Sequence, residues 1–149
     1  MTKIIPPALL VVLLAAPAAA IAAEPASLSE VLECTLPADK ALSALERADI
    51  PVTGQSVQVS NVAAYGVPVV RVEAFKSQSS LGVYFVIAPA DRERLIQAAG
   101  LEAWDDEGGA GFRRELTGKN RLNVSHPDDP NVEDGEALAT CSMRLRGGP

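Results

Sequence analysis

The sequence has few of the side chains that hold metals or act as nucleophiles. Its 149 residues include only two cysteines and one histidine. These are too few for a structural zinc site. Neither a Gly-x-Ser-x-Gly elbow nor a Ser-x-x-Lys motif is present. We therefore expect no cofactor and no metal, and a protein that is not an enzyme.

The sequence also lacks an apolar run long enough to cross a membrane, which takes about 20 residues. The longest apolar stretch lies near the start, after a lysine, and is interrupted by Pro17. It is followed by small residues, as at a signal-peptide cleavage site. Residues 1–23 are therefore predicted to be a signal peptide cleaved near Ala22 or Ala23. Residues 24–149 would then be a single exported domain in the periplasm, without a membrane anchor; an uncleaved anchor is the alternative.

Positive charge is in the minority. The chain has 13 Lys and Arg against 19 Asp and Glu, giving a formal net charge of −6. An acidic surface does not suit a polyanion, so neither nucleic acid nor an anionic membrane surface is an expected partner. The partner that this balance favours is a basic protein, and no particular oligomeric state is indicated.

The stretch between residues 67 and 100 fixes the architecture. Residues 67–75 and 81–87 are apolar, β-branched and aromatic runs separated by a short polar linker, which predicts an antiparallel hairpin at the centre of a sheet. Residues 89–99 begin with a proline and predict a helix that covers one face of the sheet, with Arg92, Glu93 and Arg94 mostly in solvent. Gly100 supplies its left-handed ending, with Ile96 near the residue that follows.

Helical and alternating patterns predict the remaining elements. A capping box at Ser27 and Glu30 predicts a short helix leading to Cys34, and residues 37–50 read as a second helix. Further strands are expected at residues 55–62, 112–116, 121–125 and 137–145. The predicted class is α+β: a mainly antiparallel sheet of about six strands, with two helices packed on it.

The two cysteines, Cys34 and Cys141, lie near opposite ends of the chain. In an exported protein an even pair is expected to form a disulfide, here joining the two termini of the domain. A bridge that closes a loop of this size is worth about 4–5 kcal/mol at most in the chain-entropy model. Two unpaired buried thiols are the alternative.

Acidic residues gather in two turn-rich segments. Residues 102–107 and 128–136 hold nine of the nineteen acids, and both read as loops. Acids around one exposed tryptophan would form an anchor with a negative rim, suited to a basic partner. The predicted binding residues are Trp104, Asp105, Asp106, Glu107, Asp128, Asp129, Glu133 and Asp134. The alternative is that these loops only keep an exported protein soluble.

Three features of the sequence allow other chemistry. The only histidine, His126, is followed by Asp128 and Asp129, which allows a small hydrolase or a metal-dependent enzyme. Glu73 and Glu115 stand among apolar strand residues and could form a carboxylate pair, but an outward-facing glutamate in a salt bridge is the favoured interpretation of each. The loop after residue 128 is rich in oxygen ligands but lacks the spacing of a helix-loop-helix calcium site, which leaves only a looser calcium site open.

The function expected from these observations is a small periplasmic binding protein without catalytic activity. Its most concrete form is an inhibitor or immunity factor that blocks a basic wall-degrading enzyme or toxin with its acidic loops. The first alternative is the enzyme that uses His126 with Asp128 or Asp129. The second is a structural component of an envelope complex, which would display an apolar patch or an unpaired strand edge.

Overall fold

The computed structural model describes residues 26–107 and 109–146. Its helices are α1 (Leu28–Leu32), α2 (Ala38–Arg47) and α3 (Arg92–Ala99), with 3-10 turns η1 (Pro89–Asp91) and η2 (Thr117–Lys119). Its strands are β1 (Thr53–Gln58), β2 (Ala63–Ala64), β3 (Val67–Lys76), β4 (Ser80–Ile87), β5 (Glu102–Asp106), β6 (Gly109–Glu115), β7 (Arg121–Ser125) and β8 (Ala137–Arg144). The predicted α+β class is confirmed.

The strands form one antiparallel sheet. Their order is β1-β3-β4-β8-β7-β6-β5, and the short β2 pairs with β3 off this path. The predicted central hairpin is confirmed: β3 and β4 pair with Ala74 opposite Val83. On its other side β4 pairs with β8, where Val83 lies opposite Cys141. The strand whose sequence is apolar on both faces is therefore an interior strand of the sheet, with a neighbour on each side.

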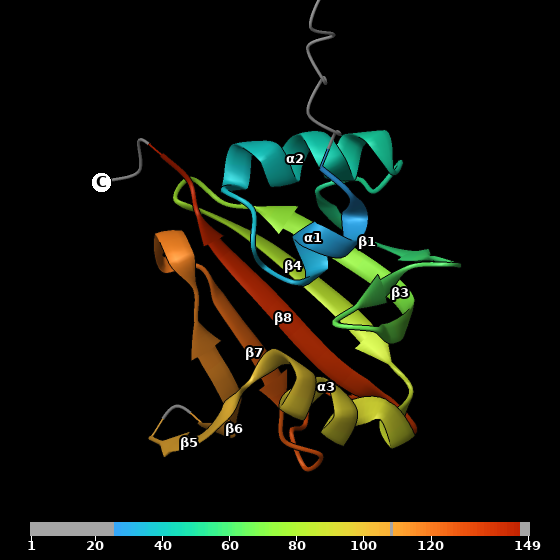
Figure 1. Ribbon diagram of the computed structural model, residues 1–149, viewed down its shortest axis with the longest axis vertical. Coiled ribbons are helices and arrows are strands. Elements are labelled where there is room, and N and C mark those ends of the chain that lie inside the picture. Colours follow the sequence, from blue (N-terminus) through green and yellow to red (C-terminus); the bar gives the residue numbers. More distant parts are fainter. Residues whose placement is uncertain (1–25, 108, 147–149) are drawn as a thin grey trace, which may run out of the picture.

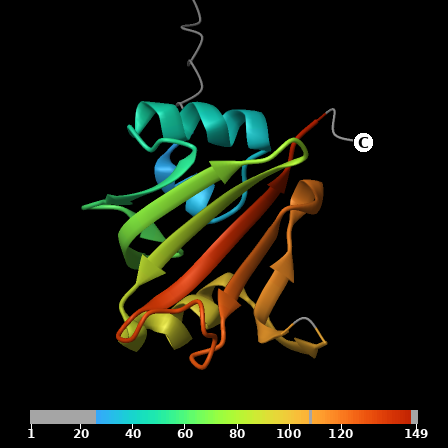
Figure 2. The ribbon, with the colours of Figure 1, turned by 180° about the vertical axis from the view of Figure 1, so that it is seen from behind.

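All three helices lie on the same side of the sheet (Figure 1), and the view from behind shows the strands of the other face uncovered (Figure 2). The capping box of α1 is present, with the Glu30 N–H donating to Ser27 Oγ over 3.3 Å. Helix α3 ends at Gly100, whose φ of 62° is left-handed. The Leu101 N–H then donates to the Ile96 carbonyl over 3.0 Å, the hydrogen bond of a Schellman ending.

The hydrophobic core lies between this helical layer and the sheet. Helices α1 to α3 contribute Val31, Leu45 and Leu95, all fully buried. The sheet contributes alternate residues of its central strands, which share one face. These are Val72 and Ala74 of β3, Val83 and Phe85 of β4, Leu122 and Val124 of β7, and Ala139 and Cys141 of β8.

The predicted disulfide between Cys34 and Cys141 is confirmed, and its Cα atoms lie 5.4 Å apart. It joins the segment after α1 to β8, near the middle of the sheet. Beside it, Asn120 is 4 % exposed and donates through Nδ2 to the carbonyls of Cys34 and Leu36, over 3.0 and 2.7 Å. One covalent and two polar links therefore hold the α1–α2 connection to the sheet.

Two expectations were wrong. Residues 102–106 are not a loop but the edge strand β5, which pairs with β6. Its acidic side chains point into solvent, so they are compatible with a strand that has only one neighbour. The side chain of Arg92 was expected in solvent. It is instead half-buried, donates to the Ser125 carbonyl over 2.9 Å and lies over the Phe112 ring.

The predicted signal peptide, residues 1–23, lies outside the described residues. Within the part of the chain that the structure describes, none of the helices has the length and apolar character needed to span a bilayer.

Candidate functional site

The two acidic segments lie at the same end of the molecule. Figures 1 and 2 both place the β5–β6 hairpin and the loop between β7 and β8 at the same end of the sheet. They border one hollow of about 520 Å³ on the uncovered side of the sheet. Its lining includes Trp104, Ala110, Asn123, His126, Asp128 and Asp129. We call the two segments and this hollow the acidic end.

Trp104 lies flat against β6, which has glycine where the ring passes. A Cβ at Gly111 would come within 3.2 Å of Trp104 Nε1, and one at Gly109 within 3.5 Å of Cη2. The indole N–H donates to Asn123 Oδ1 over 2.9 Å. The ring thus reaches across β6 to β7, and its position is fixed by two small residues and one hydrogen bond.

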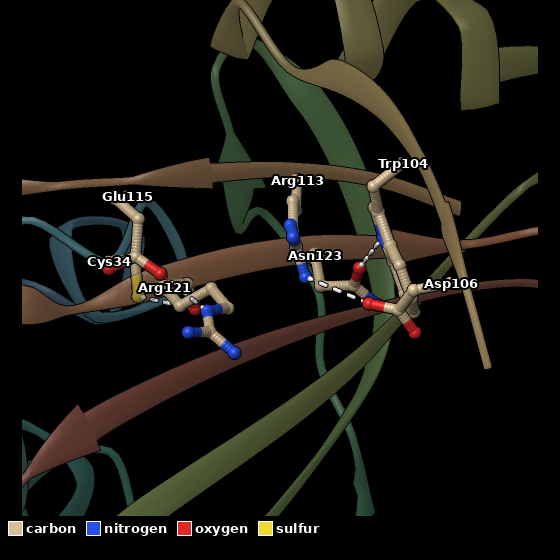
Figure 3. A network of polar contacts seen from close by, with 7 residues as sticks. All are labelled: Cys34, Trp104, Asp106, Arg113, Glu115, Arg121 and Asn123. Atoms are coloured by element: carbon tan, nitrogen blue, oxygen red, sulfur yellow. Dashed lines mark hydrogen bonds and ion pairs between the residues drawn. The ribbon is translucent and has the colours of Figure 1, made fainter. Parts of the chain in front are cut away.

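Arg113 covers part of the same ring. Its guanidinium carbon lies 4.8 Å from the ring centroid, and Nη1 lies 3.9 Å from Asp106 Oδ2. Figure 3 shows Arg113 and Asp106 meeting beside Trp104, whose nitrogen points to Asn123. The expectation of an exposed tryptophan is therefore wrong: Trp104 is half-buried. Its cationic neighbour also offsets part of the negative charge on the hairpin.

The neighbouring aspartates of the β7–β8 loop differ in their surroundings. The side chain of Asp128 is 90 % exposed. Asp129 Oδ1 accepts the backbone N–H and the side-chain Nδ2 of Asn131, both over 2.9 Å. The backbone N–H of Asn131 is the main cause of a lowered pKa for Asp129, and the Ser125 hydroxyl adds to it. Asp129 therefore shapes the loop, and Asp128 offers its charge to solvent.

The only histidine of the chain belongs to this loop. Nδ1 of His126 accepts the Asp128 N–H over 3.3 Å and lies 3.4 Å from Asp128 Oδ2. The side chain is 47 % exposed and lines the hollow. Its ring contacts are thus local to the loop, and no serine hydroxyl within the described ranges is seen bonded to it. The catalytic use of His126 stays a prediction.

The remaining predicted acids lie on the far side of the loop. Glu133 and Asp134 are exposed and line a second hollow of about 300 Å³, which His126 also borders. At the base of this loop, Glu136 receives two bonds of 2.8 Å from Arg71 on β3. This bidentate pair fastens the loop to the sheet.

The other possible centres are not assembled. Glu73 on β3 and Glu115 on β6 are separated by three strands, so they do not form a carboxylate pair. Glu115 pairs instead with Arg121 over 2.6 Å. Among residues 26–107 and 109–146, the acids, histidine and cysteines form no cluster able to hold a metal ion.

The sequence reasoning missed two residues that shape the site, Asn123 and Arg113. Both point to the uncovered face, opposite one another on β7 and β6. The sequence did contain a signal for Asn123. It lies between the apolar residues Leu122 and Val124, and this alternation places it on the outward side of the strand. The meeting of Asn123 and Arg113 with Trp104 depended on recognising β5 as a strand.

Together these residues can do two things without covalent chemistry. The exposed carboxylates can attract a cationic surface, and the hollow between them can receive a side chain. The comparisons of this chain with models of protein families, with curated proteins and with solved structures found no match.

Proposed function

We propose that this protein is a small, exported, non-enzymatic binding protein of the cell envelope, and that its acidic end binds a basic protein. The observation that carries the proposal is the shared hollow, which Trp104 and Ala110 of the β5–β6 hairpin line together with residues of the β7–β8 loop. Two segments far apart in the sequence thus meet at one hollow, which Asp128 and Asp129 of the loop line. Loops held by a rigid sheet are a common location for binding surfaces.

The charges of the acidic end suit a cationic partner. Asp105 and Glu107 on the hairpin and Asp128, Glu133 and Asp134 on the loop are all exposed. In the free protein these carboxylates are therefore hydrated. Such charges mainly increase the rate at which two oppositely charged proteins associate and orient them as they approach. Their effect decreases as salt screens them. A partner bound in this way should be lost at high ionic strength.

The hollow would supply the contact at the centre of the interface. Trp104, Asn123 and Asp128 all line it. A lysine or arginine of the partner could place its aliphatic part near the indole and its charge near Asp128. In its most specific form the partner is a basic wall-degrading enzyme or toxin, and this chain is its inhibitor or immunity factor.

The test is a pull-down from cell-envelope extract with oxidised residues 24–149, at low and at high salt. The disruptive variant combines Asp105→Asn with Asp128→Asn. The matched control combines Asp39→Asn with Glu93→Gln, which removes the same charge from exposed positions on α2 and α3. We expect one basic protein in stoichiometric amount, lost at high salt and lost from the disruptive variant only. An equal loss from both variants, or no retained protein, would refute the proposal.

A further inference from the structure

A third hollow lies away from the acidic end, between α2 and the edge strand β1. Its volume is about 770 Å³, within the range of ligand-binding clefts. Its apolar side chains include Leu42, Ile50, Val52 and Val57. We call it the α2–β1 groove.

The strand beside this groove has free hydrogen-bonding groups. Within the described residues β1 pairs only with β3. The Val59 N–H donates to the Val70 carbonyl over 3.0 Å, and Val57 lies opposite Val72. Because successive residues of a strand direct their backbone groups to alternate sides, those of Ser56 and Gln58 point away from β3. Each offers one donor and one acceptor to a further strand.

This edge carries little protection against pairing. The sequence of β1 is Thr-Gly-Gln-Ser-Val-Gln, without charge or proline. Sheet edges are usually guarded by charged side chains, prolines or bulges. The one such device is an irregularity in register between Thr53 and Ser56, which leaves residues 56–58 regular. By contrast β5, the other edge, carries acids at Glu102, Asp105 and Asp106.

The negative charge around the groove favours a segment that carries a basic residue. The only charged side chains in its lining are Glu46 of α2 and Asp49 of the α2–β1 connection, and both are exposed. An extended segment beside β1 would point alternate side chains toward α2. Apolar ones would meet Leu42 and Val57, and a basic one would meet the two acids.

We propose that the α2–β1 groove binds an extended apolar segment of a partner protein that carries one basic residue. The segment adds a strand beside β1, so its main chain bonds to Ser56 and Gln58 while its side chains enter the groove. This site is independent of the acidic end, and its existence does not rest on the proposed function.

The test uses nuclear magnetic resonance with three capped heptapeptide probes at millimolar concentration. The first alternates threonine and valine around a central lysine, the second has glutamate in place of lysine, and the third is the lysine peptide N-methylated at alternate amides. We expect the lysine peptide to shift the amides of residues 55–58 and of α2. It should bind about fivefold more tightly than the glutamate peptide, the scale of an exposed ion pair. The methylated peptide should not shift these amides.

Two variants locate the contact. Ser56→Pro removes the outward N–H, a change that edge strands tolerate, and should abolish binding. Glu46→Lys alters only an exposed helix position. It leaves Asp49 as the one acid of the lining and should remove the preference between the lysine and glutamate peptides. Glu93→Lys on α3 is the matched control and should leave binding and this preference unchanged. The proposal is overturned if the lysine peptide leaves β1 unshifted, if both charges bind equally, or if the methylated peptide binds as well.

Discussion

The two edges of the sheet end the same antiparallel ladder but differ in chemistry. β5 is acidic, and its tryptophan is packed on β6 under Arg113. β1 is uncharged and lies beside an apolar groove. An acidic edge repels other strands and attracts cations from a distance, whereas a neutral edge can accept a strand directly. One fold thus provides one surface whose binding depends on salt and another whose binding depends mainly on main-chain hydrogen bonds.

The largest effect is expected at the disulfide, which supports the β1 side more than the β5 side. Replacing both cysteines, Cys34→Ser with Cys141→Ser, should lower the free energy of unfolding by about 4–5 kcal/mol at most, because the bridge closes a loop with a sequence separation of 107 residues. Urea unfolding measures the loss. Hydrogen exchange should show the amides of α1 and α2 losing more protection than those of β6.

Equal loss of protection in α2 and β6 would show that the bridge stabilises the whole sheet rather than its helical layer. No change in unfolding free energy would contradict its structural role altogether.

The next effect concerns the packing of the β5 edge. In Gly111→Ala the new Cβ would lie 2.7 Å from the Val124 carbonyl oxygen and 3.2 Å from Trp104 Nε1. Because the oxygen belongs to the backbone, we expect a loss of about 1–3 kcal/mol in unfolding free energy and a changed Trp104 fluorescence. Gly82→Ala is the matched control. The atoms nearest its Cβ belong to the Phe75 side chain, at 2.6 and 2.7 Å, and a side chain can shift more readily than backbone.

The control should therefore cost less than Gly111→Ala and leave the tryptophan emission as it is. The reverse order of the two variants would mean that Trp104 is not packed on β6 as described.

A smaller effect is expected from removing the ion pair that links β3 to the β7–β8 loop. Arg71 on β3 and Glu136 at the base of the β7–β8 loop form a bidentate pair, with side chains 26 % and 23 % exposed. Glu136→Gln should lower the free energy of unfolding by about 1 kcal/mol. Glu115→Gln, which breaks the more exposed pair with Arg121, should cost less. Chemical denaturation measures the unfolding free energy of both variants. An equal loss in the two would contradict the claim that the Arg71–Glu136 pair is the more stabilising one.

The smallest effect is a pH dependence inside the acidic end. The Asn131 N–H lowers the pKa of Asp129 from its usual value of about 3.8. Since the folded pKa is the lower one, the charged carboxylate contributes stability above the unfolded pKa, and that contribution is lost as pH falls through the folded value. Asp129→Asn keeps an acceptor but removes the charge. Its deficit in unfolding free energy, below about 1 kcal/mol, should be present at neutral pH and disappear in acid. A deficit independent of pH would disprove this.

Much of the fold could be predicted because its signals are local. The apolar run of β4 and the left-handed Gly100 are encoded within a few residues, and the single cysteine pair left only one bridge to form. The prediction failed at β5, because Asp105 and Asp106 have low strand propensity and their position at an edge is a property of the whole sheet. Strand order also decides which elements flank the acidic hollow and the α2–β1 groove, so neither could be derived from the sequence.

The central claim is that the β5–β6 turn and the β7–β8 loop bind one partner together. Site-specific photocrosslinking tests it most directly, with the crosslinking residue at Ala110 on β6 or at Pro130 in the loop. Both positions line the hollow and are uncharged, so every acid is retained. Ala98, exposed on α3, is the control position. The account predicts that Ala110 and Pro130 capture the same basic protein from envelope extract and that Ala98 does not. Capture of different proteins at the two positions, or of none, would contradict it.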